Sequence, residues 1–297
     1  MKRLLTICLA LAITLTALPA TAAIHELPID QTGGYPVSAD NLLPDTGGYK
    51  DESIDVQIEY LTYRRTKCFI VRVKLANPTQ LRTAMTYDRA ERHDYVKASI
   101  IAKQKNSVVC VNGDFFKYND YGYLVRQGVL YRDAANGEHD ILLIDEKGDF
   151  HVAMQADADG IHKAVSDLNA EGHTVVNSLT FGPLLVQDGV AQSVTTTMYQ
   201  AGKKMMRVAI AQLGELEYAI FYCDGNVNGS NGLTMQNFAN FIADSEPRAK
   251  IAYNLDGGGS AHVVVLQHQI HKNSSGREIC DIIYFASASD LLGERED

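Results

Sequence analysis

The sequence predicts an α+β fold, a single large domain with a central mixed β-sheet flanked by helices. Short apolar stretches typical of buried strands recur along the chain, whereas only two segments have helical periodicity. Strands and helices do not alternate regularly, which argues against a doubly wound sheet. No internal repeat or low-complexity segment divides the chain. We therefore expect one domain, preceded by a leader and an arm.

The first 22 residues have the pattern of a removable signal peptide. Lys2 and Arg3 precede an apolar stretch that is short for a membrane-spanning helix, and small residues at 20 and 22 suit signal peptidase. A retained membrane anchor is the alternative. We expect cleavage and export to the periplasm or the extracellular space, with no membrane span afterwards.

Proline and glycine are frequent between residues 23 and 50, which predicts an extended N-terminal arm. The domain itself is expected to occupy residues 51–297. The sequence does not define an oligomeric state.

The chain is acidic, with a formal net charge of -9 and no dense run of lysine or arginine. This charge argues against nucleic acid or an anionic membrane as a partner. A phosphate-bearing ligand would therefore need hydrogen-bond donors gathered at one site.

Four cysteines remain after the predicted cleavage, and in an exported protein they allow two disulfides in three pairings. Two of them lie inside apolar strands, where a free thiol is often simply a small buried side chain. We favour structural thiols, although the sequence leaves the disulfide status open, and no spacing resembles a zinc site. The four are Cys68, Cys110, Cys223 and Cys280.

The alternating patterns at residues 56–60 and 68–75 predict a hairpin. Helices are expected at 88–105 and 234–244, the second with Thr234 as its N-cap. Their inward side chains are expected to be Val96, Ala98, Ile100 and Ile101 in the first, and Met235, Phe238, Phe241 and Ile242 in the second. Further strands are expected at 108–111, 128–131, 139–144, 149–154, 183–186, 207–212, 218–223, 251–253 and 263–266.

Three strongly apolar strands end at asparagine or aspartate, with glycine close behind. The strand at 108–111 runs into Asn112-Gly113-Asp114, and the strand at 218–223 runs into Asp224-Gly225. The strand at 251–253 runs into Asn254, Leu255, Asp256 and three consecutive glycines. Each Asx-Gly pair alone is typical of a turn, and the glycines are compatible with a hairpin bulge. Three such ends on strands buried on both faces favour a functional site at one sheet edge.

Four segments, in this order along the chain, resemble the phosphodiester glycosidase family: VNGDFF, the strand from Arg207 to Ile210, the stretch from Asp224 to Ala239 that contains GLTMQNFA, and NLDGGGSA. The resemblance covers roughly residues 83–285. The chain departs from the family at Met206 to Ala211, where PRTAIG is frequent, and at Asp114, where glycine is frequent. The resemblance implies an exported hydrolase that cleaves the glycosidic C–O bond of a sugar-1-phosphodiester, such as a GlcNAc-1-phosphodiester, to release free sugar and a phosphomonoester.

The resemblance also implies which residues form the site. A phosphomonoester is a good leaving group, so donors to the departing charge matter more than a strong acid. Asp256 is expected to be catalytic or to position the water, with Asp114 as the second acid/base candidate and Asp224 as a further carboxylate. Which aspartate does which job, and whether the reaction retains or inverts, stay open. Arg207 and the backbone amides of three glycines are expected to donate to phosphate, and Asn112 to hydrogen-bond sugar or phosphate. The expected substrate-binding residues are thus Asn112, Arg207, Gly257, Gly258, Gly259, Ser260, Thr234 and His262.

Other interpretations compete with this one. The loop from Asp224 to Gly229 opens like an EF-hand, but Met235 stands where the motif requires glutamate. The sequence therefore requires no cofactor and leaves calcium or magnesium binding open. Ser230 and Ser260 lie in no G-x-S-x-G nucleophile motif. A non-catalytic glycan-binding or cell-envelope protein is the main alternative, and a metal-dependent phosphodiesterase that cuts P–O bonds is a third.

Overall fold

The computed structural model describes residues 34–90, 94–195, 200–227, 229–271 and 276–288 of the 297-residue chain. The predicted signal peptide lies outside these residues, as does the first part of the predicted arm. Strands in the described ranges form four sheets, of nine, five, three and two strands. All strand pairs assigned there are antiparallel.

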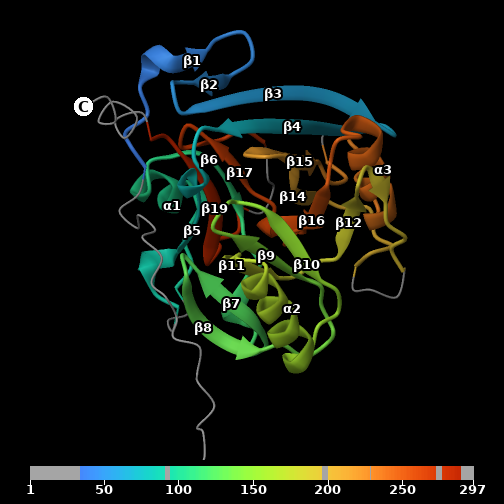
Figure 1. The fold of residues 1–297 in the computed structure, drawn as a ribbon. Coiled ribbons are helices and arrows are strands. Elements are labelled where there is room, and N and C mark those ends of the chain that lie inside the picture. The colour runs from blue at the N-terminus through green and yellow to red at the C-terminus, as the bar shows by residue number, and fades with distance from the viewer. Residues whose placement is uncertain (1–33, 91–93, 196–199, 228, 272–275, 289–297) are drawn as a thin grey trace, which may run out of the picture.

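The nine-stranded sheet contains the predicted hairpin, which the pairing from Ile54–Leu75 to Tyr63–Thr66 confirms. It also contains the strands that lead to Asp224 and Asp256 (Figure 1). In spatial order its strands are β1 (Leu42–Leu43), β2 (Gly48–Lys50), β3 (Ile54–Tyr63), β4 (Thr66–Leu75), β15 (Glu217–Cys223), β14 (Arg207–Gly214), β16 (Ile251–Asn254), β12 (Leu184–Gln187) and β13 (Val190–Ala191).

The other three sheets are smaller. In spatial order the five-stranded sheet comprises β18 (His268–Gln269), β17 (Val263–Val265), β6 (Ser107–Asn112), β19 (Asp281–Ala286) and β5 (Leu81–Met85). The three-stranded sheet comprises β10 (Phe150–Ala153), β9 (Ile141–Asp145) and β11 (Val175–Thr180). The two-stranded sheet comprises β7 (Gly122–Arg126) and β8 (Val129–Ala134).

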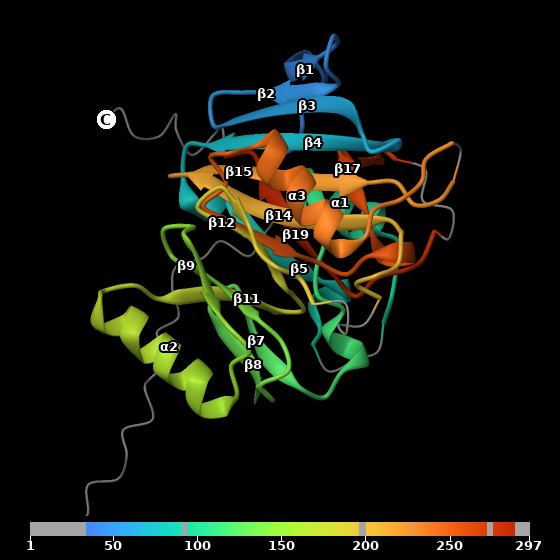
Figure 2. The same ribbon diagram turned by 90° about the vertical axis from the view of Figure 1, so that its right-hand side faces the viewer.

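The largest core lies where the nine-stranded, five-stranded and three-stranded sheets meet, and Ile220, Ile283 and Leu142 are fully buried there. Helix α3 (Met235–Ser245) packs on the other face of the nine-stranded sheet, and α1 (Ala98–Gln104) packs on the other face of the five-stranded sheet. Helix α2 (Ala158–Ala170) lies beside β9 and β11, as Figure 2 shows.

This arrangement corrects the predicted single mixed sheet. The core lies between antiparallel sheets, so the central strands are covered by another sheet on one face and by a helix on the other. Such strands are apolar at every position, which is also the pattern of a strand in a parallel sheet. Composition alone therefore does not separate the two architectures.

The helix predicted at 234–244 is confirmed as α3, and the Thr234 hydroxyl caps it by accepting a hydrogen bond from the Asn237 amide at 3.2 Å. The helix predicted at 88–105 is shorter than expected. Helix α1 begins at Ala98 because Val96 forms an antiparallel bridge with Ile279. Ile100, predicted to face inward, is 44% exposed.

The sequence interpretation missed α2. Asp157 caps this helix through a hydrogen bond from the Gly160 amide, but only Ile161 and Leu168 among its residues are buried. Two buried positions over a helix of this length give almost no apolar periodicity.

Candidate active site

The ends of β6 and β16 meet at a junction between the two largest sheets. Asn112, the last residue of β6, donates a hydrogen bond from Nδ2 to the Asp256 carbonyl at 2.8 Å, and its Oδ1 accepts one from the His262 amide at 2.9 Å. The side chain of Asn112 thus fastens both ends of the glycine-rich loop, residues 255–262, to the five-stranded sheet. Its amide group is used to position this loop.

Asp114 lies beneath this loop in a buried charge cluster. Its Oδ1 accepts from Arg126 Nη2 at 2.9 Å, and the same Nη2 lies 2.8 Å from Asp281 Oδ2. Its Oδ2 accepts from the Thr180 amide at 2.8 Å. Burial raises the pKa of Asp114 to about 6, with Arg126 opposing and Asp281 adding to the rise. Both carboxylate oxygens therefore have partners within the protein.

The glycine before Asp114 is required by this cluster. A Cβ at Gly113 would lie 2.1 Å from Asp281 Oδ2, which is far inside van der Waals contact. The residue after Asp114, Phe115, has a left-handed backbone with φ 50°. Such strain in a non-glycine residue is often found at functional sites.

Asp256 follows β16 and lies in the glycine-rich loop at this junction. Burial raises its pKa to about 6, against the effects of a Ser260 hydrogen bond, the Arg277 charge and the Gly257 amide, and with a smaller upward contribution from Asp114. Asp256 retains partial solvent exposure, unlike Asp114. A carboxyl group that titrates near neutral pH is suited to proton transfer.

A pocket of about 340 Å³ adjoins the loop. Ser260 and Arg277 line it and are also the side chains that act on Asp256, and Arg277 Nη1 donates to Ser260 Oγ at 3.1 Å. The pocket thus combines a cation with a nearby carboxylate. Its aromatic lining consists of Tyr95, Phe115 and Tyr118.

The glycine-loop amides expected to bind phosphate are largely engaged within the protein. Gly258 N donates to the Met206 carbonyl at 2.9 Å, and the Gly257 amide donates to the Asp256 carboxylate. Gly258 has φ +58°, and a Cβ at Gly257 would lie 3.1 Å from the Met206 carbonyl oxygen. These glycines therefore allow the loop to approach Met206 closely. Gly259 also makes an interaction within the protein.

Arg207 lies on the α3 side of the nine-stranded sheet, away from the pocket beside Ser260. Its guanidinium donates to the carbonyls of Leu233, Gln200 and Lys203 at 2.9, 2.9 and 2.8 Å. Burial lowers its pKa to about 10. Arg207 and the helix cap Thr234 thus have defined structural contacts, and the cation beside the glycine-rich loop is Arg277.

Asp224 and His262 are also separated from that pocket. Asp224 lines a different cavity of about 290 Å³ with Lys67 and His271, and burial raises its pKa. The His262 ring is buried between Gln269 Oε1 at 3.2 Å and the Arg277 carbonyl at 2.8 Å. Of the three predicted catalytic aspartates, the structure brings Asp114 and Asp256 together and places Asp224 in the second cavity.

Sequence reasoning missed Arg277 and Asp281. Arg277 lies in a polar stretch with no periodicity, and Asp281 opens an apolar strand where it resembles an ordinary surface residue. The sequence holds one indirect signal that Asp281 is buried. A buried arginine needs a carboxylate partner, and Asp281 is such a partner of Arg126.

The chain belongs to the phosphodiester glycosidase family, because the model of that family matches residues 105–286, more than half of its length. Membership supports a hydrolase that acts on phosphodiester-linked sugars as the general activity. No curated protein matches the sequence.

Solved structures share the fold at low sequence identity. The catalytic domain of zebrafish N-acetylglucosamine-1-phosphodiester alpha-N-acetylglucosaminidase, auto-inhibited by its pro-peptide, matches with a TM-score of 0.63 and 17% identity over 80% of this chain and 85% of that chain. A hypothetical protein from Synechocystis matches with a TM-score of 0.57 and 15% identity over 82% of this chain and 64% of that chain. A protein from Burkholderia pseudomallei, described as exported, matches with a TM-score of 0.50 and 13% identity over 74% of each chain.

None of the helices in the described part of the chain has the length and apolar character needed to cross a bilayer.

Proposed function

We propose that this protein is an exported hydrolase that cleaves the glycosidic C–O bond of a sugar-1-phosphodiester, of the GlcNAc-1-phosphodiester type, to release free sugar and a phosphomonoester. Family membership supports the reaction class. The observation that carries the proposal is Asp256, a carboxyl group whose pKa burial raises to about 6 and which interacts with Ser260 and Arg277, two residues that line a pocket. The proposal assigns the reaction to this pocket.

In the proposed reaction, ionised Asp256 orients a water molecule and accepts a proton from it as the water oxygen bonds to the anomeric carbon. The bond between that carbon and the phosphate oxygen breaks, and its electron pair leaves with the phosphomonoester. The leaving group needs little protonation, so one carboxylate near neutral pKa is sufficient for the proton transfer. Asp114, whose oxygens are occupied by Arg126 and Thr180, acts on Asp256 only through its charge.

Arg277 supplies the positive charge for the phosphate. Its guanidinium reaches Ser260 Oγ at 3.1 Å and faces the pocket, where it would donate to the oxygens that gain charge as the bond breaks. The sequence-based choice for this role, Arg207, is committed to three backbone carbonyls.

The aromatic lining supports a sugar as the other half of the substrate. The rings of Tyr95 and Phe115 lie 5.0 and 5.2 Å from that of Tyr118, so the three form one apolar surface. The C–H faces of a pyranose pack well on such a surface, while its hydroxyl groups need polar neighbours such as Glu278. The pocket volume of about 340 Å³ accommodates a monosaccharide.

Hydrolysis of a synthetic GlcNAc-1-phosphodiester in oxygen-18 water tests the proposal. C–O cleavage leaves the released phosphomonoester unlabelled, whereas P–O cleavage labels it and would identify a phosphodiesterase. The phosphate is the decisive product because the anomeric hydroxyl of a free sugar exchanges with water. Binding without product would instead identify a non-catalytic glycan-binding protein.

Export is part of the same proposal and has a separate test. Expression with the native leader is expected to yield a mature chain outside the cytoplasm whose N-terminus follows Ala22. Recovery of the intact precursor in the membrane fraction would contradict it.

A further inference from the structure

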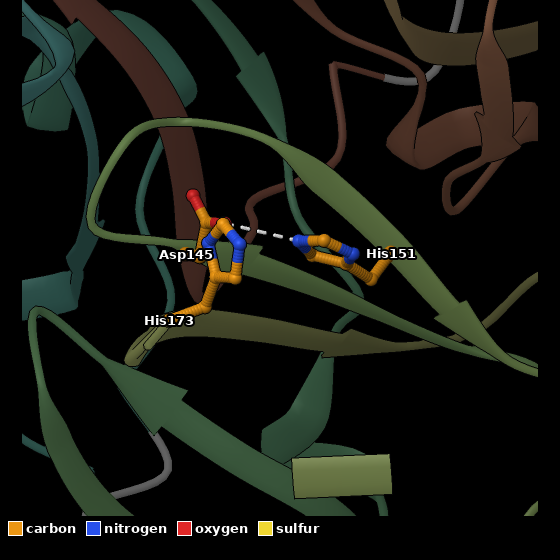
Figure 3. A group of neighbouring side chains, drawn as sticks. All are labelled: Asp145, His151 and His173. Carbon is orange, nitrogen blue, oxygen red and sulfur yellow. Dashed lines mark hydrogen bonds and ion pairs between the residues drawn. The ribbon is translucent and has the colours of Figure 1, made fainter. Parts of the chain in front are cut away.

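A group of side chains outside the candidate active site has the composition of a metal centre. Asp145, His151 and His173 converge at one end of the three-stranded sheet, as Figure 3 shows, and their ligand atoms all lie within 4.8 Å of one another. His151 Nε2 is 3.0 Å from Asp145 Oδ2, and His173 Nδ1 is 2.7 Å from the same oxygen. Two imidazoles thus face one carboxylate oxygen.

The strand pairing explains why these residues meet although they are far apart in sequence. Asp145 ends β9, the central strand of the sheet. His151 in β10 pairs with Leu143, which lies on the same face of β9 as Asp145. His173 lies two residues before β11, whose first residue Val175 pairs with Asp145. Strand β9 thus supplies Asp145, β10 supplies His151, and the segment that leads into β11 supplies His173.

Asp145 is held as a fixed anion. Its Oδ1 accepts hydrogen bonds from the amides of Lys147 and Asp149, both at 2.9 Å, which leaves Oδ2 to the two histidines. Its side chain is 0% exposed. Orientation of a metal-binding carboxylate by such outer hydrogen bonds is typical of protein metal sites.

His173 provides the second observation that points to a ligand. Its Nδ1 is buried and close to Asp145 Oδ2, yet the geometry does not satisfy a hydrogen bond. A buried imidazole nitrogen without a hydrogen-bond partner is costly. Coordination of a cation between Nδ1 and Oδ2 would satisfy both atoms.

We propose that Asp145, His151 and His173 bind one divalent transition-metal ion of the Zn²⁺ class. Zinc bonds of about 2.0–2.2 Å place tetrahedral ligand atoms roughly 3.3 Å apart, so small rotations of the two rings suffice. Imidazole donors favour zinc and its neighbours over calcium and magnesium, which prefer oxygen. The side chains of His151 and His173 are 32% and 20% exposed, so water can complete the coordination.

The ion has a structural role in this proposal. Thr180, whose amide binds Asp114, pairs with Ile141 at the opposite end of β9 from Asp145. The metal therefore lies away from the candidate catalytic carboxylates and cross-links β9, β10 and the start of β11. Its loss is expected to lower thermal stability while the reaction at the pocket retains its chemistry.

The test is titration of the metal-stripped full chain with Zn²⁺ by calorimetry, together with thermal unfolding. We expect one ion per chain and a higher melting temperature in excess Zn²⁺. The variants H151A and H173A are expected to weaken binding at least about tenfold, since even outer-shell changes cost 10–100-fold. Co²⁺ in place of Zn²⁺ is expected to give an absorption spectrum typical of nitrogen and oxygen ligation, which H173A removes.

His162 offers a matched control, because its Nε2 contacts Asp133 Oδ2 at 2.7 Å in an exposed pair with a single imidazole. The variant H162A is expected to bind Zn²⁺ like the unaltered chain. Equal loss in H162A, binding of several ions that no variant affects, or absence of binding would each overturn the proposal. Asp145→Asn is a weaker test because the carboxylate also orders the turn through Lys147 and Asp149.

Discussion

Replacement of Asp256 by asparagine is expected to abolish most activity and, at the same time, to stabilise the fold at alkaline pH. Asn keeps the size of the side chain and an acceptor for the Gly257 amide but removes the charge. If Asp256 accepts a proton from water, the rate is expected to fall by about 10²–10⁴-fold, the usual contribution of a general base. In the unaltered enzyme, activity is expected to rise as pH rises through about 6, where Asp256 ionises.

The stability gain follows from the direction of the pKa shift. Burial raises the pKa of Asp256 from 3.8 to about 6, so the folded protein holds this proton more tightly than the unfolded chain does. The ionisation of Asp256 therefore costs stability, beginning above about pH 4 and reaching its full cost above about pH 6. A shift of about 2 units corresponds to roughly 3 kcal/mol, so D256N is expected to unfold at a higher temperature at pH 8 and to show no gain at pH 4.

Chemical or thermal unfolding of both chains at pH 4 and pH 8, with hydrolysis rates measured between these values, provides the comparison. Asp140→Asn is a matched control, because Asp140 is buried and its two oxygens accept from the amides of Gln155 and Leu184 at 3.0 and 2.9 Å. That variant is expected to lose stability at both pH values. A D256N chain that is less stable at pH 8, or that keeps full activity, would refute the reasoning.

Three further predictions test the assignment of the two arginines, the packing at Gly113 and the burial of the cysteines. Arg277→Ala is expected to reduce kcat/KM about 10–100-fold, which is the value of one charge-assisted contact to phosphate, with little change in melting temperature. Arg207→Ala is instead expected to lower the melting temperature, because it leaves buried carbonyls without a hydrogen-bond donor. Gly113→Ala is expected to destabilise the protein by about 1–3 kcal/mol in denaturant unfolding through its clash with Asp281, while Gly202→Ala, where nothing lies within 4 Å of the new Cβ, is expected to be neutral. Thiol reagents are expected to label none of the four buried cysteines in the native chain and all four after unfolding, because burial raises their pKa and keeps them as thiols. Labelling of the native protein at any of them would contradict this prediction. The four are Cys68, Cys110, Cys223 and Cys280.

The sequence was sufficient to predict the helices and strands whose hydrophobic pattern and end signals lie within the element itself. The hairpin of β3 and β4 alternates clearly, and Thr234 marks the start of α3 with an apolar face behind it. The sequence was insufficient where pairing with a residue far away along the chain determines the local structure. The helix predicted from residue 88 begins only at Ala98 because Val96 pairs with Ile279, which no local rule reveals.

The same limit applies to the candidate site. Asp114 and Asp256 were predicted from strand ends, and the structure places both at one junction. The choice between Arg207 and Arg277 as the cation was beyond the sequence, because it depends on long-range packing: Arg207 binds backbone carbonyls on the α3 side, whereas Arg277 reaches Ser260 beside the pocket. Likewise, His173 becomes a neighbour of Asp145 only through the pairing of β11 with β9.

The fastening of the glycine-rich loop by Asn112 has a consequence for biogenesis. The hydrogen bond from Asn112 to Asp256 joins residues separated by 144 positions, and the one from His262 to Asn112 spans 150. A chain emerging from the ribosome therefore holds the first half of the junction long before the second half is synthesised. Closure of such long loops costs conformational entropy, so contacts of this kind slow folding. A chain that ends before the glycine-rich loop is therefore expected to lack this junction, because Asn112 then has neither Asp256 nor His262 as a partner.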